Sequence, residues 1–297
     1  METRRDFLKT TVGLAGAVAL GFTVKKKGPH LSFSTLGCPK WTLSQIIKTA
    51  VDQGYEAIEL RGLEGEMFLP KRPEFSTAVA ATRRQFSDSK LKVCGLGSSA
   101  TLHYADAAKR KTNLDEARQF IDLAHQLDCP YVRVFPNNLP KEQEKQQTLD
   151  LITEGLLELA PYAKSANVSV LLETHGDLVY KDDLQKILKG ANHPNVGAIW
   201  DIFNMWSVTK EPPAEVFKVL QPYVRHTHIK DARQEGDKYA YTFIGQGVVP
   251  LREAIDALKA SGYSGYYSFE WEKMWHPEIA EPELAFADYP KSIQKYF

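Results

Sequence analysis

The stretch VSVLLETHGDLVYKDDLQKILKGANHPNVGAIW, residues 168–200, contains the repeating unit that decides the fold. It begins with an apolar run, Val168–Leu172, continues through a segment of helical spacing, Lys181–Leu188, and ends in a second apolar run, Val196–Trp200. A helix between two strands is the usual connection between parallel neighbours in a sheet. Runs that are apolar on both faces suit strands buried between a core and a layer of helices.

The same unit recurs along the chain from Leu31 onward. The other strand-like runs are Leu31–Thr35, Ala57–Leu60, Leu91–Leu96, Tyr131–Phe135, Val224–Ile229 and Gly265–Phe269. The other helical segments are expected near Leu43–Gln53, Ser76–Phe86, Leu114–Leu127, Gln146–Ser165, Pro213–Leu220 and Leu251–Ala260, with a last segment over Pro282–Tyr296. Eight such units predict an α/β fold, a (β/α)₈ TIM barrel formed as a single domain by residues 28–297. An open doubly wound sheet is the rival, but no strand is followed by the Gly-x-Gly-x-x-Gly loop that binds a dinucleotide.

The overall charge is balanced, since Lys and Arg together number 37 and Asp and Glu also number 37. Proteins that bind nucleic acid usually carry a basic excess, so we expect no nucleic-acid partner. The three cysteines, Cys38, Cys94 and Cys129, are odd in number and widely spaced, which argues against a disulfide framework or a zinc ribbon. We expect mostly buried thiols.

The N-terminal segment has the features of an export signal. Arg4-Arg5-Asp6-Phe7-Leu8-Lys9 precedes a short, glycine-rich apolar stretch over residues 10–24. A charged start followed by such a stretch is typical of a secretory signal, and the paired arginines closely resemble a twin-arginine signal. We therefore treat residues 1–27 as a signal peptide or anchor and expect an exported, periplasmic protein. Membrane association is expected only if this segment is retained.

Acidic side chains and a histidine follow or end the last four strand-like runs. They are Glu173, Asp201, His228 and Glu270. Catalytic residues of a TIM barrel come from the carboxyl ends of its strands, so these four should converge. One such acid alone is commonly a helix cap, but four on successive strands favour a shared cation. A carboxylate-rich set with one nitrogen suits Mn²⁺, Mg²⁺ or Co²⁺, with Zn²⁺ also compatible.

Two histidines alternate on one strand. His226 and His228 are two residues apart, so both point to the same side of the strand. One of them can be a metal ligand while the other lies beside it in the core.

Four motifs make the chain resemble the xylose isomerase-like superfamily, in particular its sugar phosphate isomerase/epimerase group. They are Leu172-Glu173-Thr174-His175, Trp200-Asp201-x-x-Asn204, His226-x-His228-x-Lys230-Asp231 and Phe269-Glu270. The resemblance implies one divalent metal held by Glu173, Asp201, His228 and Glu270. It also implies that Glu173 and Glu270 act as acid and base beside a sugar carbonyl, through an enediolate.

Further side chains near these motifs are candidates for substrate binding. His175 follows Glu173 by two residues, and Lys230 and Arg233 follow His228, where either cation can stabilise an oxyanion. Asn204 stands where many ketose epimerases have a histidine, which weakens an assignment to that subgroup. Sugar rings stack on indoles, so tryptophans near the mouth of the barrel could form a wall of the substrate pocket. We expect at least half of these tryptophans to be core residues instead. The tryptophans are Trp41, Trp206, Trp271 and Trp275.

Several functions remain open from the sequence. The first is a metal-dependent sugar isomerase or epimerase. The second is an exported lyase or hydratase that uses the same metal and glutamates on 3-keto-glycosides, which suits a site of action outside the cytoplasm. The third is an apurinic endonuclease with a trinuclear zinc cluster, for which His103 could supply a ligand, whereas Phe135-Pro136-Asn137 lacks another expected histidine. A non-catalytic sugar-binding relative is the last. The first two imply a small-molecule sugar or glycoside as partner, and a homo-oligomer is compatible with the sequence.

Overall fold

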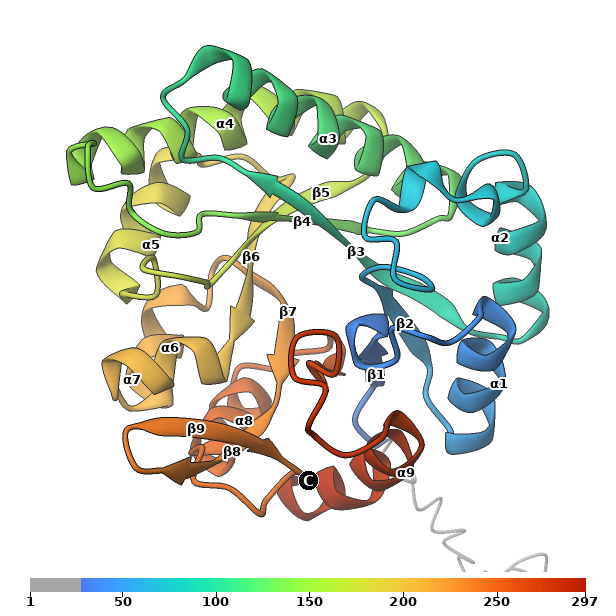
Figure 1. Ribbon diagram of the computed structural model, residues 1–297. Coiled ribbons are helices and arrows are strands. Elements are labelled where there is room, and N and C mark those ends of the chain that lie inside the picture. Colours follow the sequence, from blue (N-terminus) through green and yellow to red (C-terminus); the bar gives the residue numbers. More distant parts are fainter. Residues whose placement is uncertain (1–27) are drawn as a thin grey trace, which may run out of the picture.

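Eight parallel strands close into a barrel in the computed structural model, which describes residues 28–297 (Figure 1). Around the barrel the strand order is β1-β10-β7-β6-β5-β4-β3-β2. The strands are β1 (Leu31–Ser34), β2 (Ala57–Leu60), β3 (Lys92–Thr101), β4 (Tyr131–Phe135), β5 (Ser169–Glu173), β6 (Val196–Asp201), β7 (Val224–Ile229) and β10 (Tyr267–Phe269). The predicted (β/α)₈ TIM barrel is therefore confirmed. The predicted signal over residues 1–27 lies outside the described residues.

Helices form the outer layer of the barrel (Figure 1). They are α1 (Leu43–Gln53), α2 (Val79–Asp88), α3 (Ala107–Gln126), α4 (Lys145–Ser165), α5 (Lys181–Gly190), α6 (Ile202–Thr209), α7 (Pro213–Leu220), α8 (Leu251–Ala260) and α9 (Pro282–Ser292). Short 3₁₀ turns occur at η1 (Thr35–Gly37), η2 (Leu69–Lys71), η3 (Pro73–Phe75) and η4 (Ile293–Tyr296). After each strand, the chain thus passes through a segment packed on the outside of the barrel before it enters the next strand.

Local chemistry explains where the helices begin and end. The Thr42 side chain accepts from the Gln45 backbone N–H, and the Gln45 side chain accepts from that of Thr42, which is a complete capping box at the start of α1. Gly54 ends the same helix in the left-handed region, at φ 78°. Helix α3 begins at Ala107, earlier than the predicted Leu114, because the Asp106 side chain accepts from the Lys109 N–H.

Two elements at the carboxyl end of the barrel were not predicted. Helix α6 follows β6 directly, and an antiparallel hairpin, β8 (Asp231–Glu235) with β9 (Lys238–Thr242), follows β7. Phe203 of α6 packs edge-on against Tyr241 of β9, with ring centroids 5.4 Å apart. The hairpin and α6 thereby form one cover beside the ends of β6 and β7.

The barrel interior becomes charged toward the carboxyl ends of the strands. Glu59, Arg133 and His226 are buried although they are polar, whereas most of the remaining core is aliphatic and aromatic. The three cysteines are buried as predicted, each at most 2% exposed. Buried charges are rare unless they are paired or bind a metal, so the polar interior marks the functional end of the barrel.

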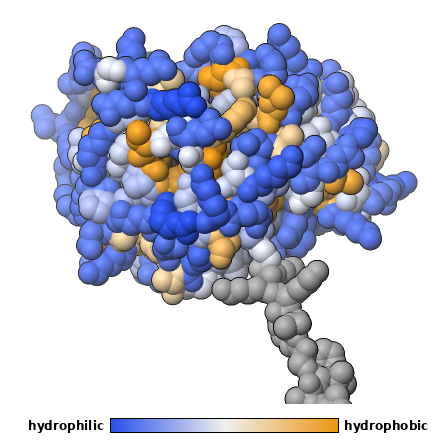
Figure 2. Space-filling model, turned by 90° about the horizontal axis from the view of Figure 1, so that it is seen from below, coloured by the Kyte–Doolittle hydropathy of each residue, from blue (hydrophilic) through white to orange (hydrophobic). Residues whose placement is uncertain are grey.

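The outer surface is mainly hydrophilic on the face seen from below, with hydrophobic side chains in separate small groups (Figure 2). Within residues 28–297, no helix is both long and apolar enough to cross a membrane.

Candidate metal centre

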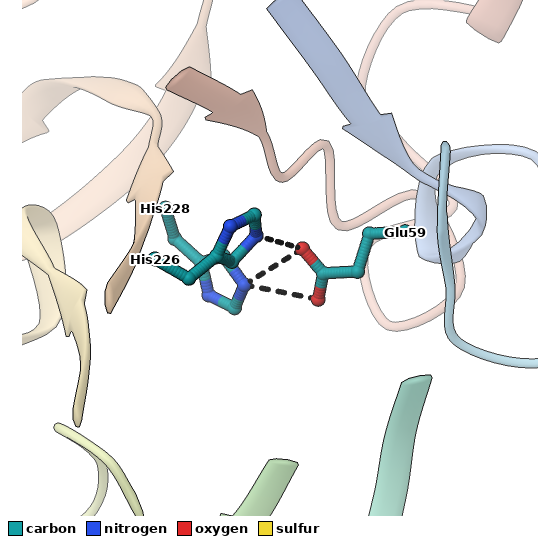
Figure 3. Close-up of side chains that lie close together, drawn as sticks. All are labelled: Glu59, His226 and His228. Atoms are coloured by element: carbon teal, nitrogen blue, oxygen red, sulfur yellow. Dashed lines mark hydrogen bonds and ion pairs between the residues drawn. The ribbon is translucent and has the colours of Figure 1, made fainter. Parts of the chain in front are cut away.

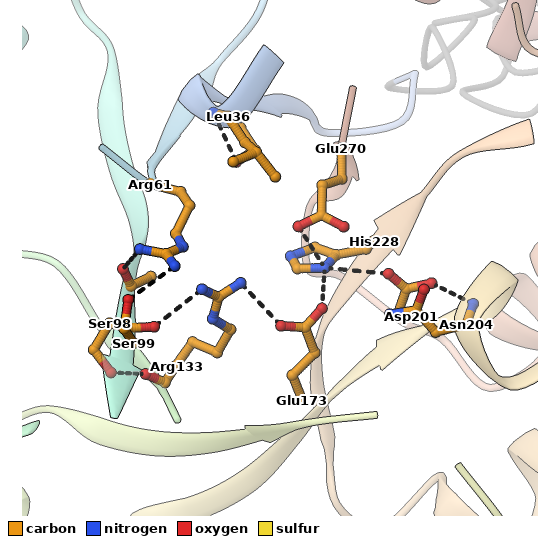
Figure 4. Close-up of polar contacts among 12 residues, drawn as sticks. Leu36, Arg61, Ser98, Ser99, Arg133, Glu173, Asp201, Asn204, His228 and Glu270 are labelled. Carbon is orange, nitrogen blue, oxygen red and sulfur yellow. Dashed lines mark hydrogen bonds and ion pairs between the residues drawn. The ribbon is translucent and has the colours of Figure 1, made fainter. Parts of the chain in front are cut away.

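Four buried side chains converge at the carboxyl end of the barrel (Figure 4). Glu173 ends β5, Asp201 ends β6, His228 lies in β7 and Glu270 directly follows β10. One ligand atom from each lies within 4.8 Å of the others, and no member of the set is more than 3% exposed. The structure thus brings together the four residues that the sequence analysis selected.

His228 presents one ring nitrogen to all three carboxylates. Its Nδ1 lies 3.2 Å from Glu173 Oε1, 3.3 Å from Glu270 Oε1 and 3.6 Å from Asp201 Oδ2. Burial alone would lower the pKa of His228, but Glu270, Glu59 and Glu173 together raise it well above its usual value. The negative charge around Nδ1 therefore attracts either a proton or a metal cation.

Asp201 has two roles at the start of α6. Its Oδ1 accepts from the Asn204 backbone N–H at 2.8 Å, so this carboxylate is indeed a helix cap. Its Oδ2 is buried and has no hydrogen-bond partner within the described residues, although Lys230 Nζ lies 2.8 Å away. One oxygen thus caps the helix, and the other faces the Lys230 ammonium group on the side of the converging residues.

Negative charge exceeds positive charge around these residues. Among the described residues, the carboxylates of the cluster are Glu59, Glu173, Asp201, Glu270 and Glu272, and its Lys and Arg side chains are Arg61, Arg133 and Lys230. Buried carboxylates need compensation, and one divalent cation would supply it if the histidines are neutral. Three carboxylates and one imidazole form a donor set that fits such an ion.

Lys230 lies inside the cluster. Its Nζ is 2.6 Å from Glu270 Oε2 and 2.5 Å from Glu272 Oε1, and the residue is only 1% exposed. Burial opposes its charge, but Asp201, Glu270 and Glu272 raise the pKa of Lys230 well above its usual value. Lys230 is therefore a buried ammonium ion next to two of the converging carboxylates, not a solvated loop charge.

Two buried arginines also lie at this end, and neither was predicted from the sequence. Arg133 of β4 donates through Nη1 to Glu173 Oε2 at 2.9 Å and through Nη2 to the Ser98 carbonyl at 3.0 Å. Arg61, just after β2, donates to Ser99 Oγ at 3.0 Å. Burial and the charge of Arg133 lower the pKa of Arg61 to about 9. The signal available in the sequence was a charged residue, Arg133, in the middle of the apolar strand Tyr131–Phe135.

Glu59 of β2 is the third missed residue (Figure 3). It lies 2.8 Å from His226 Nε2 and 3.0 Å from His228 Nε2, and it accepts from Ser268 Oγ at 3.0 Å. Burial raises the pKa of this carboxyl group, but His228 and His226 lower it well below its usual value overall. The two nitrogens of His228 thus face different partners, with Nδ1 toward the converging carboxylates and Nε2 toward Glu59.

His175 and Asn204 lie beside the cluster. The His175 ring is half-buried, its centroid lies 4.6 Å from that of Phe135, and its Nδ1 has no hydrogen-bond partner within residues 28–297. Asn204 donates through Nδ2 to the Thr174 carbonyl at 3.3 Å, which links α6 to the end of β5.

Other predicted binding residues lie elsewhere. Trp271 is 1% exposed, stacks on Phe269 and donates through Nε1 to the Ala280 carbonyl, so it belongs to the core. Arg233 is exposed on β8 and donates to Gln246. The structure therefore places neither of them among the side chains around His228.

The remaining tryptophans also differ in position. Trp206 is half-buried and lies under Lys210, whose Nζ is 4.1 Å from the ring centroid. Trp41 packs edge-on against Phe286, whereas Trp275 is 53% exposed. Trp206 and Trp275 are thus the two with accessible surface.

The curated proteins similar to this chain include an epimerase and a dehydratase. A fructoselysine 3-epimerase of Shigella flexneri is 23% identical over 260 residues, which covers 84% of this chain and 91% of the relative. A 3-dehydroshikimate dehydratase of Bacillus anthracis is 24% identical over 226 residues, with 72% and 78% covered. These relatives therefore support an enzyme that acts on a small sugar-like molecule, without specifying the reaction.

The fold is also that of known structures. The IOLI protein, solved with a bound zinc atom, has a TM-score of 0.77 at 20% identity and covers 90% of this chain and 99% of its own. The model of the xylose isomerase-like TIM barrel family matches residues 47–294. This match covers most of the sequence, including all four converging residues, and the chain belongs to the xylose isomerase-like TIM barrel family.

Proposed function

We propose that this protein is a divalent-metal-dependent enzyme that isomerises or epimerises a sugar by moving a proton next to a carbonyl group. The observation that carries the proposal is the buried set of Glu173, Asp201, His228 and Glu270, whose ligand atoms lie within 4.8 Å of one another. The similarity to a fructoselysine 3-epimerase supports sugar chemistry.

One metal ion would be held by these four side chains. Its carboxylate-rich donor set favours Mn²⁺, Mg²⁺ or Co²⁺, and Zn²⁺ is also compatible. When bound, such an ion acts as a Lewis acid that polarises the substrate carbonyl and so makes the neighbouring C–H group more acidic. The Nδ1 proton of His228 has to leave before this nitrogen can bind a metal.

Glu173 and Glu270 are the proposed acid and base. They come from β5 and from the end of β10, on two sides of His228, and each is fixed by a buried cation: Arg133 holds Glu173 and Lys230 holds Glu270. Burial raises the pKa of both, but Arg133 lowers that of Glu173 and His228 lowers that of Glu270 below the usual value. Both are thus carboxylates at neutral pH, so either can accept the substrate proton, and the one that acts as the acid has to gain a proton before it donates it.

Lys230 is the proposed group that stabilises negative charge on a substrate oxygen. Its ammonium ion is buried beside Glu270 and Asp201, where a hydrogen bond to a developing oxyanion is stronger than in water. Within residues 28–297 the buried Nδ1 of His175, two residues after Glu173, has no hydrogen-bond partner, which makes His175 the proposed contact to a substrate hydroxyl.

A lyase or hydratase acting on 3-keto-glycosides is the second candidate. It shares the first step, removal of a proton next to a ketone, and then expels an oxygen substituent in place of returning the proton. The similarity to a 3-dehydroshikimate dehydratase favours this candidate, because a dehydratase expels an oxygen as water. Export of the protein, which Arg4 and Arg5 predict, favours glycosides as substrates.

An apurinic endonuclease is less well supported. His103 Nδ1 lies 2.9 Å from the Pro136 carbonyl, and His103 joins neither group of metal-type ligands within residues 28–297. The balanced charge of the chain also disfavours binding to a phosphate backbone. A non-catalytic sugar-binding protein is disfavoured because the set of four ligands is complete.

The experiment that separates the two main candidates uses purified protein loaded with Mn²⁺. It is incubated separately with free ketoses and with a 3-keto-glucoside, and the products are analysed. A changed ketose mixture supports the epimerase, and released aglycone supports the lyase. Glu270→Gln, which keeps the shape of the side chain, should lower either rate by about 10²–10⁴-fold. Conversion that proceeds equally well after metal removal contradicts both candidates.

A further inference from the structure

Glu59 connects strands that are not neighbours in the barrel. It lies on β2, whereas His226 and His228 lie on β7, and β1 and β10 stand between them. Its carboxylate crosses the interior and lies against the Nε2 atoms of both imidazoles, at 2.8 Å for His226 and 3.0 Å for His228 (Figure 3). One carboxylate therefore contacts two histidines, of which only His228 belongs to the four converging residues.

The position of Glu59 is itself fixed. Ser268 Oγ donates to its Oε2 at 3.0 Å, and Ser268 is paired with His228 in the register between β10 and β7. Glu59, His226, His228 and Ser268 are each at most 1% exposed. Neither the carboxylate nor the imidazoles can turn toward water to exchange these partners.

A carboxylate in contact with Nε2 determines whether Nδ1 has a lone pair free to bind a metal. A neutral imidazole carries its proton on one nitrogen and a lone pair on the other. Because Glu59 can only accept, it keeps the proton of His228 on Nε2, and the lone pair then lies on Nδ1. Nδ1 is the nitrogen that lies 3.2–3.6 Å from Glu173, Glu270 and Asp201.

We propose that Glu59 is a positioning residue of the metal centre, which holds His228 in the ring orientation and tautomer that present Nδ1 to the ion. This inference rests on the proposed function, since it requires a metal at the four converging residues. His226 belongs to the same hydrogen-bonded arrangement. Its Nε2 holds the other side of the Glu59 carboxylate, so that the acid cannot rotate away from His228.

A purely structural role is the competing explanation, and it makes a different prediction. If Glu59 only balanced charge in the core, its replacement would destabilise the fold without changing metal affinity. If it orients His228, Glu59→Gln should weaken metal binding even in folded protein. The Gln amide replaces one carboxylate oxygen with an NH₂ group, which can only donate, so an Nε2–H that faces it loses its acceptor and that imidazole must change its tautomer or turn.

The test measures Mn²⁺ binding by the electron paramagnetic resonance signal of free Mn²⁺. Glu59→Gln should weaken Mn²⁺ binding by about 10–100-fold, the usual effect of losing a partner of a ligand histidine. Ser268→Ala removes a neighbouring hydrogen bond but leaves both imidazoles paired with Glu59, and is expected to change the affinity less than about threefold. Asp183→Asn, at a buried acid of α5, controls for a general loss of stability.

A second measurement follows the imidazole protons of ¹⁵N-histidine-labelled protein without metal. The Nε2–H of His228 should exchange slowly in the wild type and in Ser268→Ala, and rapidly in Glu59→Gln. If Glu59→Gln does not fold, Glu59→Asp takes its place, because its shorter side chain withdraws from the imidazoles while keeping the charge. It should also weaken Mn²⁺ binding, by at least about fivefold.

The outcomes separate this inference from the proposed function. Wild-type protein that binds no divalent metal overturns the metal centre itself. Wild-type protein that binds Mn²⁺, together with a folded Glu59 variant that binds it equally tightly and keeps a slowly exchanging Nε2–H, overturns only the role of Glu59.

Discussion

Arg133 and Glu173 form a buried ion pair on the neighbouring strands β4 and β5, with Nη1 2.9 Å from Oε2. Both side chains are at most 3% exposed, so water does not screen the interaction. The pair uses one oxygen of Glu173 and leaves Oε1 beside His228. Arg133 therefore fixes the direction in which Glu173 can offer its second oxygen to a ligand.

Replacing this arginine should destabilise the protein in a way that depends on metal. Arg133→Met leaves a buried carboxylate without its partner, which costs about 3–5 kcal/mol of unfolding free energy in metal-free protein. Mn²⁺ should recover part of the loss, because it compensates the charge of Glu173. Denaturant unfolding with and without Mn²⁺ measures both values. Arg118→Met is the matched control, since Arg118 pairs with Glu158 at the surface and should cost less than about 1 kcal/mol. An equal loss with and without Mn²⁺ would contradict the shared role of Glu173.

Lys230 should oppose metal binding while supporting catalysis. Lys230→Met removes a positive charge 2.8 Å from Asp201 Oδ2. The converging carboxylates, which are all retained, should therefore bind Mn²⁺ more tightly. The same change should lower kcat by about 10²–10³-fold, because the donor to the substrate oxygen is lost. Mn²⁺ titration and steady-state kinetics measure the two effects. Lys210→Met, at a lysine over the Trp206 ring, should change neither by much. Weaker Mn²⁺ binding by Lys230→Met would show that this lysine supports the ligands.

The three cysteines should be unreactive in native protein. Burial raises the pKa of Cys129 to about 12 and that of Cys38 and Cys94 well above the usual range. At pH 8 the thiols are therefore protonated as well as inaccessible, and the thiolate is the reactive form. Ellman's reagent should label no cysteine of folded protein and all three in denaturant. Rapid labelling of the native protein at pH 8 would mean that one of these sites opens readily.

The capping interaction at the start of α1 should contribute to the stability of the fold but not to metal binding. Thr42→Ala removes the capping side chain and should cost about 1 kcal/mol, through loss of the contact with the Gln45 N–H. Thermal unfolding measures the loss, and Mn²⁺ titration should show unchanged affinity. Thr42→Ser, which keeps the hydroxyl group, should retain most of the stability. A marked loss of Mn²⁺ affinity in Thr42→Ala would mean that the metal centre depends on stability far from the site.

The barrel and the four converging residues could be predicted from sequence because both follow from strand positions. Apolar runs locate the strands, and the residue after each run lies at the same end of a parallel barrel. Glu173 and Glu270 were found in this way.

Side-chain direction was harder to predict. Trp271 directly follows Glu270, yet successive residues of an extended segment point to opposite sides, and the indole enters the core. Glu59 and Arg133 lie inside strands, where their type alone does not show whether they face the interior. Helix α6 was missed because Asp201, read as a candidate ligand, is also its cap.

Metal content is the measurement that tests the central claim most directly. Purified wild-type protein, reconstituted with Mn²⁺ and freed of excess, is analysed by inductively coupled plasma mass spectrometry beside folded Glu173→Gln and His228→Ala variants. The proposed centre predicts one equivalent of divalent metal per chain in the wild type and little in either variant. A wild type that retains no metal, or variants that retain as much as the wild type, would contradict the assignment of Glu173, Asp201, His228 and Glu270 as a metal site.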